Sequence, residues 1–171
     1  MDGDNGDGNS NGVGIGGGPS GPPCPLIRTL VREDVARLTR MDERATGRNR
    51  RAWYDGKLKR ALEESDLRIS LGAEMDGTLV GALLGTLQYG EYGLPEPVAV
   101  LDTILVDGDF RRRGVATAMF DQLVKNLEAL GIESLRTEVL WNDRELVGFL
   151  GKNGFAPARR LVLERSLRES V

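Results

Sequence analysis

The sequence predicts an α/β domain built around one mixed, mostly antiparallel twisted sheet that is flanked by helices. Strand-type and amphipathic segments follow one another in the order β-α-α-β-β-β-α-β-α-β. An Asp-Gly pair in "MDGT", a strong hairpin signal, joins two of the strand-type segments. The length of 171 residues suffices for a single domain with a substantial core.

Residues 1–25 differ in composition from the rest of the chain. "MDGDNGDGNSNGVGIGGGPSGPPCP" is rich in glycine and proline and poor in apolar side chains. Such a segment cannot bury enough apolar surface to offset the entropy of ordering, so we expect a disordered tail at 1–25 and a folded domain at 26–171. A GxGxxG match inside the tail has no strand before it and no helix after it, and therefore predicts no dinucleotide site.

The elements of the first half follow from the spacing of apolar residues. "LIRTLV" at 26–31 is a short strand candidate. Residues 32–46 and 49–65 each place apolar side chains at helical spacing, which predicts two amphipathic helices. "LRISLGAEMDGTLVGALLGTLQYG", residues 67–90, predicts two strands joined by the Asp-Gly turn.

The second half contains the more regular pattern. "VAVLDTILV", residues 98–106, is rich in β-branched and aliphatic residues and predicts a strand. A helix is expected from Val115 to Leu130, followed by a strand at 134–141 and a short helix over 142–153 that begins at Asn142 or Asp143. "RRLVLERSL", residues 159–167, predicts a last strand.

Charge and composition exclude several classes of function. The 23 Lys and Arg against 26 Asp and Glu give a net charge of −3, which argues against a general binder of nucleic acid or of a membrane surface. The chain has no histidine, so a Ser-His-Asp triad and a zinc site are not expected, and we expect no metal. One cysteine, Cys24, excludes internal disulfides and fits a cytoplasmic protein.

"FRRRGVATAMF", residues 110–120, gathers three arginines at a point where a helix begins. A helix N-terminus already carries positive partial charge, so this cluster is tolerable if an anion lies in front of it. A strand, a tight turn and a helix start are the setting in which backbone N–H groups converge on a phosphate. The turn is not a Walker loop, because no Gly-Lys-Ser/Thr follows. A solvated basic helix start remains the alternative.

The stretch "RRRGVA", together with the segments around it, resembles the GNAT superfamily of N-acetyltransferases. It matches that family's Arg/Gln-x-x-Gly-x-Gly/Ala motif; "VLDTILVDGDF" before it and "NGFAPARRLVLERSL" near the end are similar to other family segments, and the resemblance spans 26–167. It implies a fold with two splayed central strands and acetyl-CoA bound between them. The implied cofactor-binding residues are Ile104, Leu105 and Val106 for the pantetheine, Arg111, Arg112, Arg113, Gly114, Val115, Ala116 and Thr117 for the pyrophosphate, and Asn142 and Asp143.

Two carboxylates are candidates for the catalytic base. Glu138 matches the glutamate that serves as base in the related ribosomal-protein N-terminal acetyltransferases, and we expect it to lie in mid-strand and partly buried. Its alternative is a structural strand carboxylate that pairs with Arg136 or a neighbouring arginine. Asp102 lies inside an apolar strand, where a carboxylate is costly without a partner, so its role is structural or catalytic.

The sequence departs from the family pattern at one important position. Many members carry a tyrosine, acting as general acid, four residues before the glycine of Gly-Phe, and here that position is Leu150. Tyr89 and Tyr92, in "LQYGEYG", are candidates for a relocated acid or are simply loop aromatics. A thiolate of ordinary pKa also leaves without an acid.

The acceptor is the least determined partner. The segment "ATGRNRRAWYDGKLKR" is basic, and "YGEYGLPEP" contributes Glu91 and Glu96, so charge selects no substrate. The basic residues are Arg48, Arg50, Arg51, Lys57, Lys59 and Arg60. Three functions compete: an acetyl-CoA-dependent N-acetyltransferase acting on a protein or small-molecule amine, an inactive acyl-CoA-binding regulatory module, and a phosphate-binding interaction domain. A homodimer is an open possibility.

Overall fold

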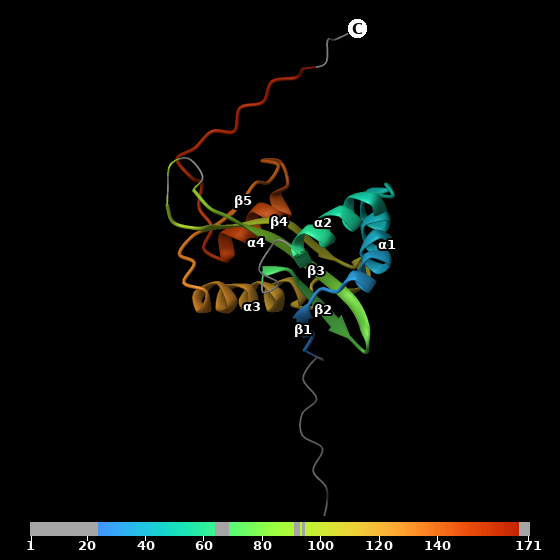
Figure 1. The fold of residues 1–171 in the computed structure, drawn as a ribbon. Helices are drawn as coiled ribbons and strands as arrows, with labels where there is room; N and C mark the ends of the chain where they lie inside the picture. The colour runs from blue at the N-terminus through green and yellow to red at the C-terminus, as the bar shows by residue number, and fades with distance from the viewer. Residues whose placement is uncertain (1–23, 64–68, 91–92, 94, 168–171) are drawn as a thin grey trace, which may run out of the picture.

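One five-stranded sheet organises the chain (Figure 1). The structure is a computed structural model that describes residues 24–63, 69–90, 93 and 95–167. The strands are β1 (Leu26–Thr29), β2 (Leu71–Met75), β3 (Thr78–Gln88), β4 (Val98–Val106) and β5 (Leu135–Thr137). They lie in sequence order, and all neighbours are antiparallel except the parallel pair β4–β5, which confirms the mixed, mostly antiparallel sheet.

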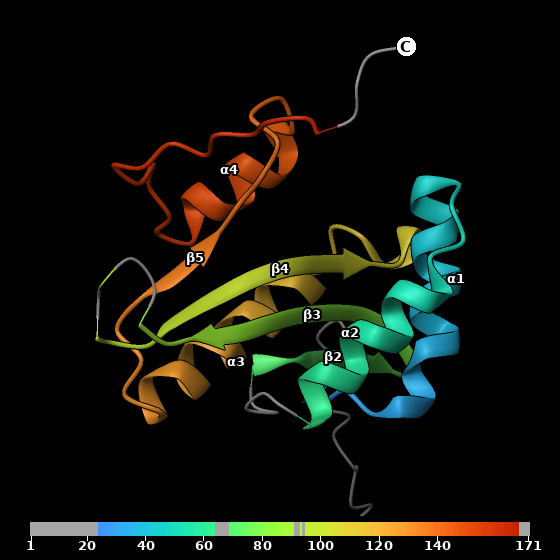
Figure 2. The same cartoon turned by 45° about the horizontal axis from the view of Figure 1, so that its top comes forward.

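Helices cover both faces of the sheet (Figure 2). They are α1 (Val35–Thr46), α2 (Arg51–Glu63), α3 (Val115–Ala129) and α4 (Arg144–Lys152), with short 3-10 turns η1 (Arg32–Asp34) and η4 (Gly108–Phe110). The helices α1 and α2 lie on one face, and α3 lies on the other. No helix in these described ranges is both long and apolar enough to cross a bilayer.

Close packing against the sheet fixes the position of α3. Val115, Met119 and Leu123 recur at helical spacing and are buried against the strands. A Cβ built on Gly81 of β3 would lie 2.8 Å from the Val115 side chain and 2.9 Å from that of Met119, so any larger residue would have to displace these side chains. This contact holds the N-terminus of α3 directly beside the end of β4.

Strand β4 carries a bulge at Asp102. Leu84 of β3 pairs with Thr103, whereas the next residue of β3, Gly85, pairs with Leu101, which leaves Asp102 as the extra residue. A bulge bends its strand and redirects a side chain. The bend falls in the middle of β4, close to the end of its pairing with β5.

The two parallel strands separate after three pairs. Ala99 lies opposite Leu135, and Leu101 lies opposite Thr137, where β5 ends. Beyond this point β4 continues for five residues to Val106, and Figure 2 shows β5 diverging from it. These are the splayed strands that the family resemblance implied.

Two of the predicted strands are wrong in extent or in kind. The strand expected at 134–141 is reduced to Leu135–Thr137, and residues 159–167 form no regular element. In the latter segment Leu161, Val162 and Leu163 are 73–89% exposed. Strands exist through pairing; β5 loses β4 where the two diverge, and no other described strand pairs with the outer edge of β5. The apolar pattern was correct for a strand, but the partner is missing.

The remaining elements agree with prediction. The Asp76–Gly77 turn joins β2 to β3 with both residues at positive φ, as an Asp-Gly hairpin requires. Strand β4 has the predicted bounds, and α3 ends one residue earlier than expected. Most of the predicted tail lies outside the described residues.

Candidate functional site

A cavity of about 710 Å³ opens where the end of β4, the start of α3 and the helix α4 meet. Strand β4, the following turn and α3 contribute Ile104, Val106, Phe110, Arg111, Arg112, Gly114, Val115, Ala116 and Thr117. The opposite wall, from α4 and its cap, contributes Asp143, Arg144, Glu145, Leu146, Gly148, Phe149 and Lys152. The cavity therefore lies on the side where β4 and β5 have separated.

The cavity brings together most of the residues predicted to bind the cofactor. Those that line it are Ile104, Val106, Arg111, Arg112, Gly114, Val115, Ala116, Thr117 and Asp143. Leu105 does not, because its side chain is buried toward α1 and α2 on the other face of the sheet. Arg113 and Asn142 also lie outside the lining; Arg113 places its guanidinium carbon 5.2 Å from the centre of the Phe110 ring.

The start of α3 presents free backbone donors to the cavity. Its first helical hydrogen bond runs from the N–H of Ala118 to the carbonyl of Gly114, at 2.9 Å. The amides of Val115, Ala116 and Thr117 precede this bond and have no acceptor within the helix. Because all three residues line the cavity, the positive end of α3 faces it.

The turn before α3 has an unusual backbone. Gly114 has φ 78° and ψ 3°, and Arg112 has φ 61°, so two residues of the turn are left-handed. For glycine this conformation is inexpensive, whereas for arginine it costs about 1–2 kcal/mol. Such a conformation persists when the surrounding structure enforces it, and it is common at functional sites.

The side-chain charge of the cavity is positive overall. Arg111 and Arg112 on one wall and Arg144 and Lys152 on the other outnumber the two acidic lining residues, Asp143 and Glu145. Together with the N-terminus of α3 these cations form an environment for an anion.

The sequence prediction missed most of the α4 wall. Asp143 caps α4, since its side chain accepts a hydrogen bond of 3.0 Å from the N–H of Leu146. Arg144, Gly148 and Lys152 then follow at intervals of four residues, which places them on one face of the helix. Two cationic residues and a glycine on the same face of a short helix are the sequence signal that could have identified this wall of the cavity.

Asp102 is an ion-paired carboxylate. Lys57 of α2 donates to its Oδ2, and the hydroxyl of Thr103 donates to its Oδ1 at 2.9 Å. The side chains of Lys57 and Asp102 are 17% and 27% exposed, so the pair remains partly accessible to water. Both carboxylate oxygens are engaged, and neither residue lines the cavity.

Glu138 lies one residue beyond the end of β5. The expectation that it is in mid-strand and partly buried is wrong, because β5 ends at Thr137 and Glu138 is exposed. It does not line the cavity, and in the described structure no ion pair joins it to Arg136. Leu101 pairs with Thr137, so the next residue along the chain is Asp102 after the one and Glu138 after the other, where the two strands separate.

The candidates for a general acid are dispersed. Leu150 is 4% exposed, so the residue at the family's tyrosine position belongs to the packed side of α4. Tyr89 follows β3 and is 68% exposed, outside the cavity lining. Tyr92, like Glu91, lies outside the described residues. Among the residues that line the cavity, none is a tyrosine, cysteine or histidine.

Most side chains of the predicted basic segment have acidic partners. Arg50 pairs with Asp42 and lies over the ring of Trp53, at 5.3 Å from its centre. Arg51, Lys57 and Lys59 also have acidic partners, which are Asp55, Asp102 and Glu63. Among the described residues Arg60 contacts only the carbonyl of Gly56, and no ion pair of Arg48 is found, so four of the six predicted cations are paired with carboxylates. Glu96, in the loop before β4, is exposed.

The fold and cavity define an α/β domain that presents a positive, concave site beside the end of a central strand, where open α/β sheets bind their ligands. The Acetyltransferase (GNAT) family matches residues 32–155 of the chain. The chain belongs to this family of acetyltransferases.

Solved structures share the fold across most of their length. An aminoglycoside N-acetyltransferase in complex with coenzyme A has a TM-score of 0.71 at 18% identity, covering 88% of this chain and 99% of its own. An aminoglycoside antibiotic 6′-N-acetyltransferase from Acinetobacter baumannii gives 0.69 at 16%, with coverages of 85% and 99%. A ribosomal-protein-alanine N-acetyltransferase from Brucella melitensis biovar Abortus gives 0.66 at 21%, with 83% and 99%. These likenesses establish the fold.

Proposed function

We propose that the protein transfers the acetyl group of acetyl-CoA to a primary amine of a peptide or a small molecule. The observation that carries the proposal is the cavity at the start of α3, where free backbone amides and a surplus of cationic side chains surround a space next to the separating strands. An acetyl carrier with a pyrophosphate fits these donors.

The residues present fit coenzyme A. Amides of residues 111–117, with the guanidinium groups of Arg111 and Arg112, would hold the pyrophosphate, and Arg144 and Lys152 would face it from α4. The free edge of β4 beyond Leu101, which β5 no longer pairs, offers backbone groups of Ile104 and Val106 to the pantetheine amides. When bound, acetyl-CoA supplies a thioester carbonyl that an amine can attack.

Proton removal from the amine is assigned to Glu138. It is exposed, and it lies beside the point where β4 and β5 part. Both oxygens of Asp102 are engaged, by Lys57 and by Thr103, so this carboxylate is assigned a structural role at the bulge. No acid is assigned, because Leu150 cannot donate a proton.

The buried Leu150 favours one second candidate, a protein that binds acyl-CoA without transferring the acyl group. Single-turnover assays with labelled acetyl-CoA separate the two. The amine panel should contain a peptide with N-terminal alanine and an aminoglycoside, since the structural neighbours carry these substrates in their names. Transfer to any amine above the buffer rate supports the enzyme, and tight CoA binding without transfer supports the binding module.

A further inference from the structure

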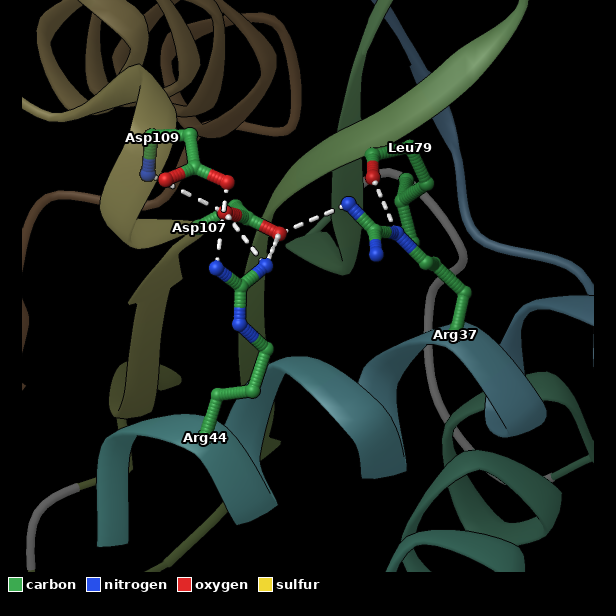
Figure 3. Close-up of polar contacts among 5 residues, drawn as sticks. All are labelled: Arg37, Arg44, Leu79, Asp107 and Asp109. Carbon is green, nitrogen blue, oxygen red and sulfur yellow. Dashed lines mark hydrogen bonds and ion pairs between the residues drawn. The ribbon is translucent and has the colours of Figure 1, made fainter.

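Asp107 follows β4 and begins the turn that leads to α3; it lies outside the cavity lining, and its side chain is 1% exposed (Figure 3). Two arginines of α1 reach it. Arg37 donates to Oδ2 at 2.7 Å and, through Nε, to the carbonyl of Leu79 at 2.9 Å. Arg44 lies 3.4 Å from both carboxylate oxygens and donates to Asp109 at 3.0 Å.

The same aspartate fixes the backbone of the turn. Its N–H donates to the carbonyl of Val80 at 2.8 Å, which continues the β3–β4 pairing by one residue. Its Oδ1 accepts from the N–H of Asp109 at 3.1 Å, and its carbonyl accepts from the N–H of Phe110 at 2.9 Å. Phe110 lines the cavity, and the left-handed Arg112 follows two residues later.

The turn therefore has one rigid anchor at each end. Its far end is held by α3, through the contact of Val115 with Gly81. Its near end is held by Asp107, which is tied to α1 by Arg37 and Arg44. Between these anchors the turn must keep Arg112 in a conformation that arginine does not favour.

We propose that Asp107, with Arg37 and Arg44, positions the amides and arginines of residues 110–114 for acetyl-CoA without touching it. This proposal rests on the proposed function. The three are positioning residues: they set the shape of the turn before the ligand arrives, so that the turn loses less conformational entropy on binding.

Substitutions that change the charge in opposite directions distinguish positioning of the turn from direct electrostatic attraction of the ligand. Asp107→Asn removes a negative charge near an anion site, so through-space electrostatics alone predicts tighter binding of CoA. Arg37→Met removes a positive charge, and electrostatics alone predicts weaker binding. If the network positions the turn, both substitutions weaken binding although they change the charge in opposite directions.

The test is isothermal titration of the full chain with CoA, below the onset of unfolding of each variant. We expect Asp107→Asn and Arg37→Met each to raise Kd about tenfold or more, and Arg37→Lys to recover part of the loss. Arg44→Gln, at a side chain 58% exposed, should fold normally and raise Kd about two- to fivefold. The kcat at saturating acetyl-CoA should change less than KM for acetyl-CoA in all four.

The matched control is Asp34→Asn. Asp34 is a comparably buried carboxylate, 8% exposed, that receives two hydrogen bonds of 2.8 Å from Arg28, away from the cavity. It should lower Tm and leave the Kd for CoA within twofold of wild type.

The proposal is overturned if Asp107→Asn binds CoA as well as or better than wild type, or if Asp107→Asn and Asp34→Asn change the Kd equally. If Asp107→Asn does not fold, unchanged Kd values for both Arg37→Met and Arg44→Gln overturn it. Failure of wild type to bind CoA would refute the proposed function itself, a result that differs from all of these.

Discussion

Leu101 of β4 lies opposite Thr137 of β5, and this is the last pair before the two parallel strands separate. The bulge at Asp102 follows immediately on β4, and Glu138 follows immediately after β5. The β4–β5 pairing therefore ends at the place in the sheet where β4 bends and where both candidate carboxylates lie in the sequence. The cavity begins three residues further on, at Ile104.

Replacement of Gly114 should abolish CoA binding while the domain remains folded. A Cβ at this position meets nothing within 4 Å, so the requirement is the positive φ rather than space inside the protein. Gly114→Ala should cost about 1–2 kcal/mol of stability or shift the backbone of the turn. We expect the CoA-induced rise in Tm to fall below 1 °C, measured by differential scanning fluorimetry.

Gly47→Ala is the control for this effect. Gly47 ends α1 with φ 69° and also has open space around its Cβ position, but it lies away from the cavity. The two variants should lose similar stability, and only the Gly114 variant should lose the response to CoA. If CoA raises the Tm of the Gly114 variant as much as that of the Gly47 variant, the conformation of the turn is irrelevant to binding.

Glu138→Gln should lower kcat by about 10²–10⁴-fold, the usual contribution of general acid–base catalysis, with the Kd for CoA unchanged. Because no acid is assigned, kcat/KM should rise toward alkaline pH without a descending limb. The measurement is a pH series of initial rates with the best acceptor.

Tyr89→Phe and Asp102→Asn are the companion variants. If Tyr89→Phe loses activity on that scale while Glu138→Gln remains near wild type, the acid lies on the loop after β3 and Glu138 is a surface carboxylate. Loss of activity in Asp102→Asn alone would transfer the role of base to the strand bulge.

The ion pair of Arg28 and Asp34 should make stability depend on acid pH. Burial acts against ionisation of Asp34, but Arg28 and the N–H of Val31 outweigh it and hold the pKa of this carboxyl below its ordinary value. Its stabilisation is present above the unfolded pKa of about 3.9 and is lost as pH falls through the lower folded pKa. The Tm difference between wild type and Asp34→Asn should therefore shrink from pH 5 to pH 2; a constant difference would contradict this.

Tyr54 offers a test at alkaline pH. Its hydroxyl is buried without a hydrogen-bond partner among the described residues, and burial, with the charge of Asp42, raises the pKa of Tyr54 to about 12. From about pH 10 to 12 the unfolded chain releases a proton that the folded chain keeps, so stability falls over that window. Tyr54→Phe should match or exceed the wild-type Tm at pH 7 and gain on it as pH rises from 10 to 12; a lower Tm at pH 7 would reveal a hidden partner.

The sequence alone predicted the elements that depend on local signals. The Asp76–Gly77 hairpin, the strand Val98–Val106 and the apolar face of α3 each follow from turn chemistry or periodicity. The strands at 134–141 and 159–167 were overestimated because β propensity says nothing about whether an edge finds a partner.

The candidate site likewise contains residues that a local motif predicts and residues whose place depends on the three-dimensional fold. The turn 111–117 has a local motif, and its residues could be named in advance. The wall from α4 could not be assigned to the cavity, because its distance from the turn depends on how far β5 diverges from β4. Nothing in the sequence singled out Asp107, because the role proposed for it depends on Arg37 and Arg44, which lie 70 and 63 residues earlier in the chain.

The binding of coenzyme A to the wild-type chain tests the central claim most directly. Saturable binding at one site is expected by titration calorimetry, weakening as salt screens the cationic cavity. CoA at 100 times its Kd adds about 2.7 kcal/mol of stability, which corresponds to a rise of about 5–10 °C in Tm for a chain of this size. No heat of binding and no change in Tm at millimolar CoA would contradict the assignment of this cavity to acetyl-CoA.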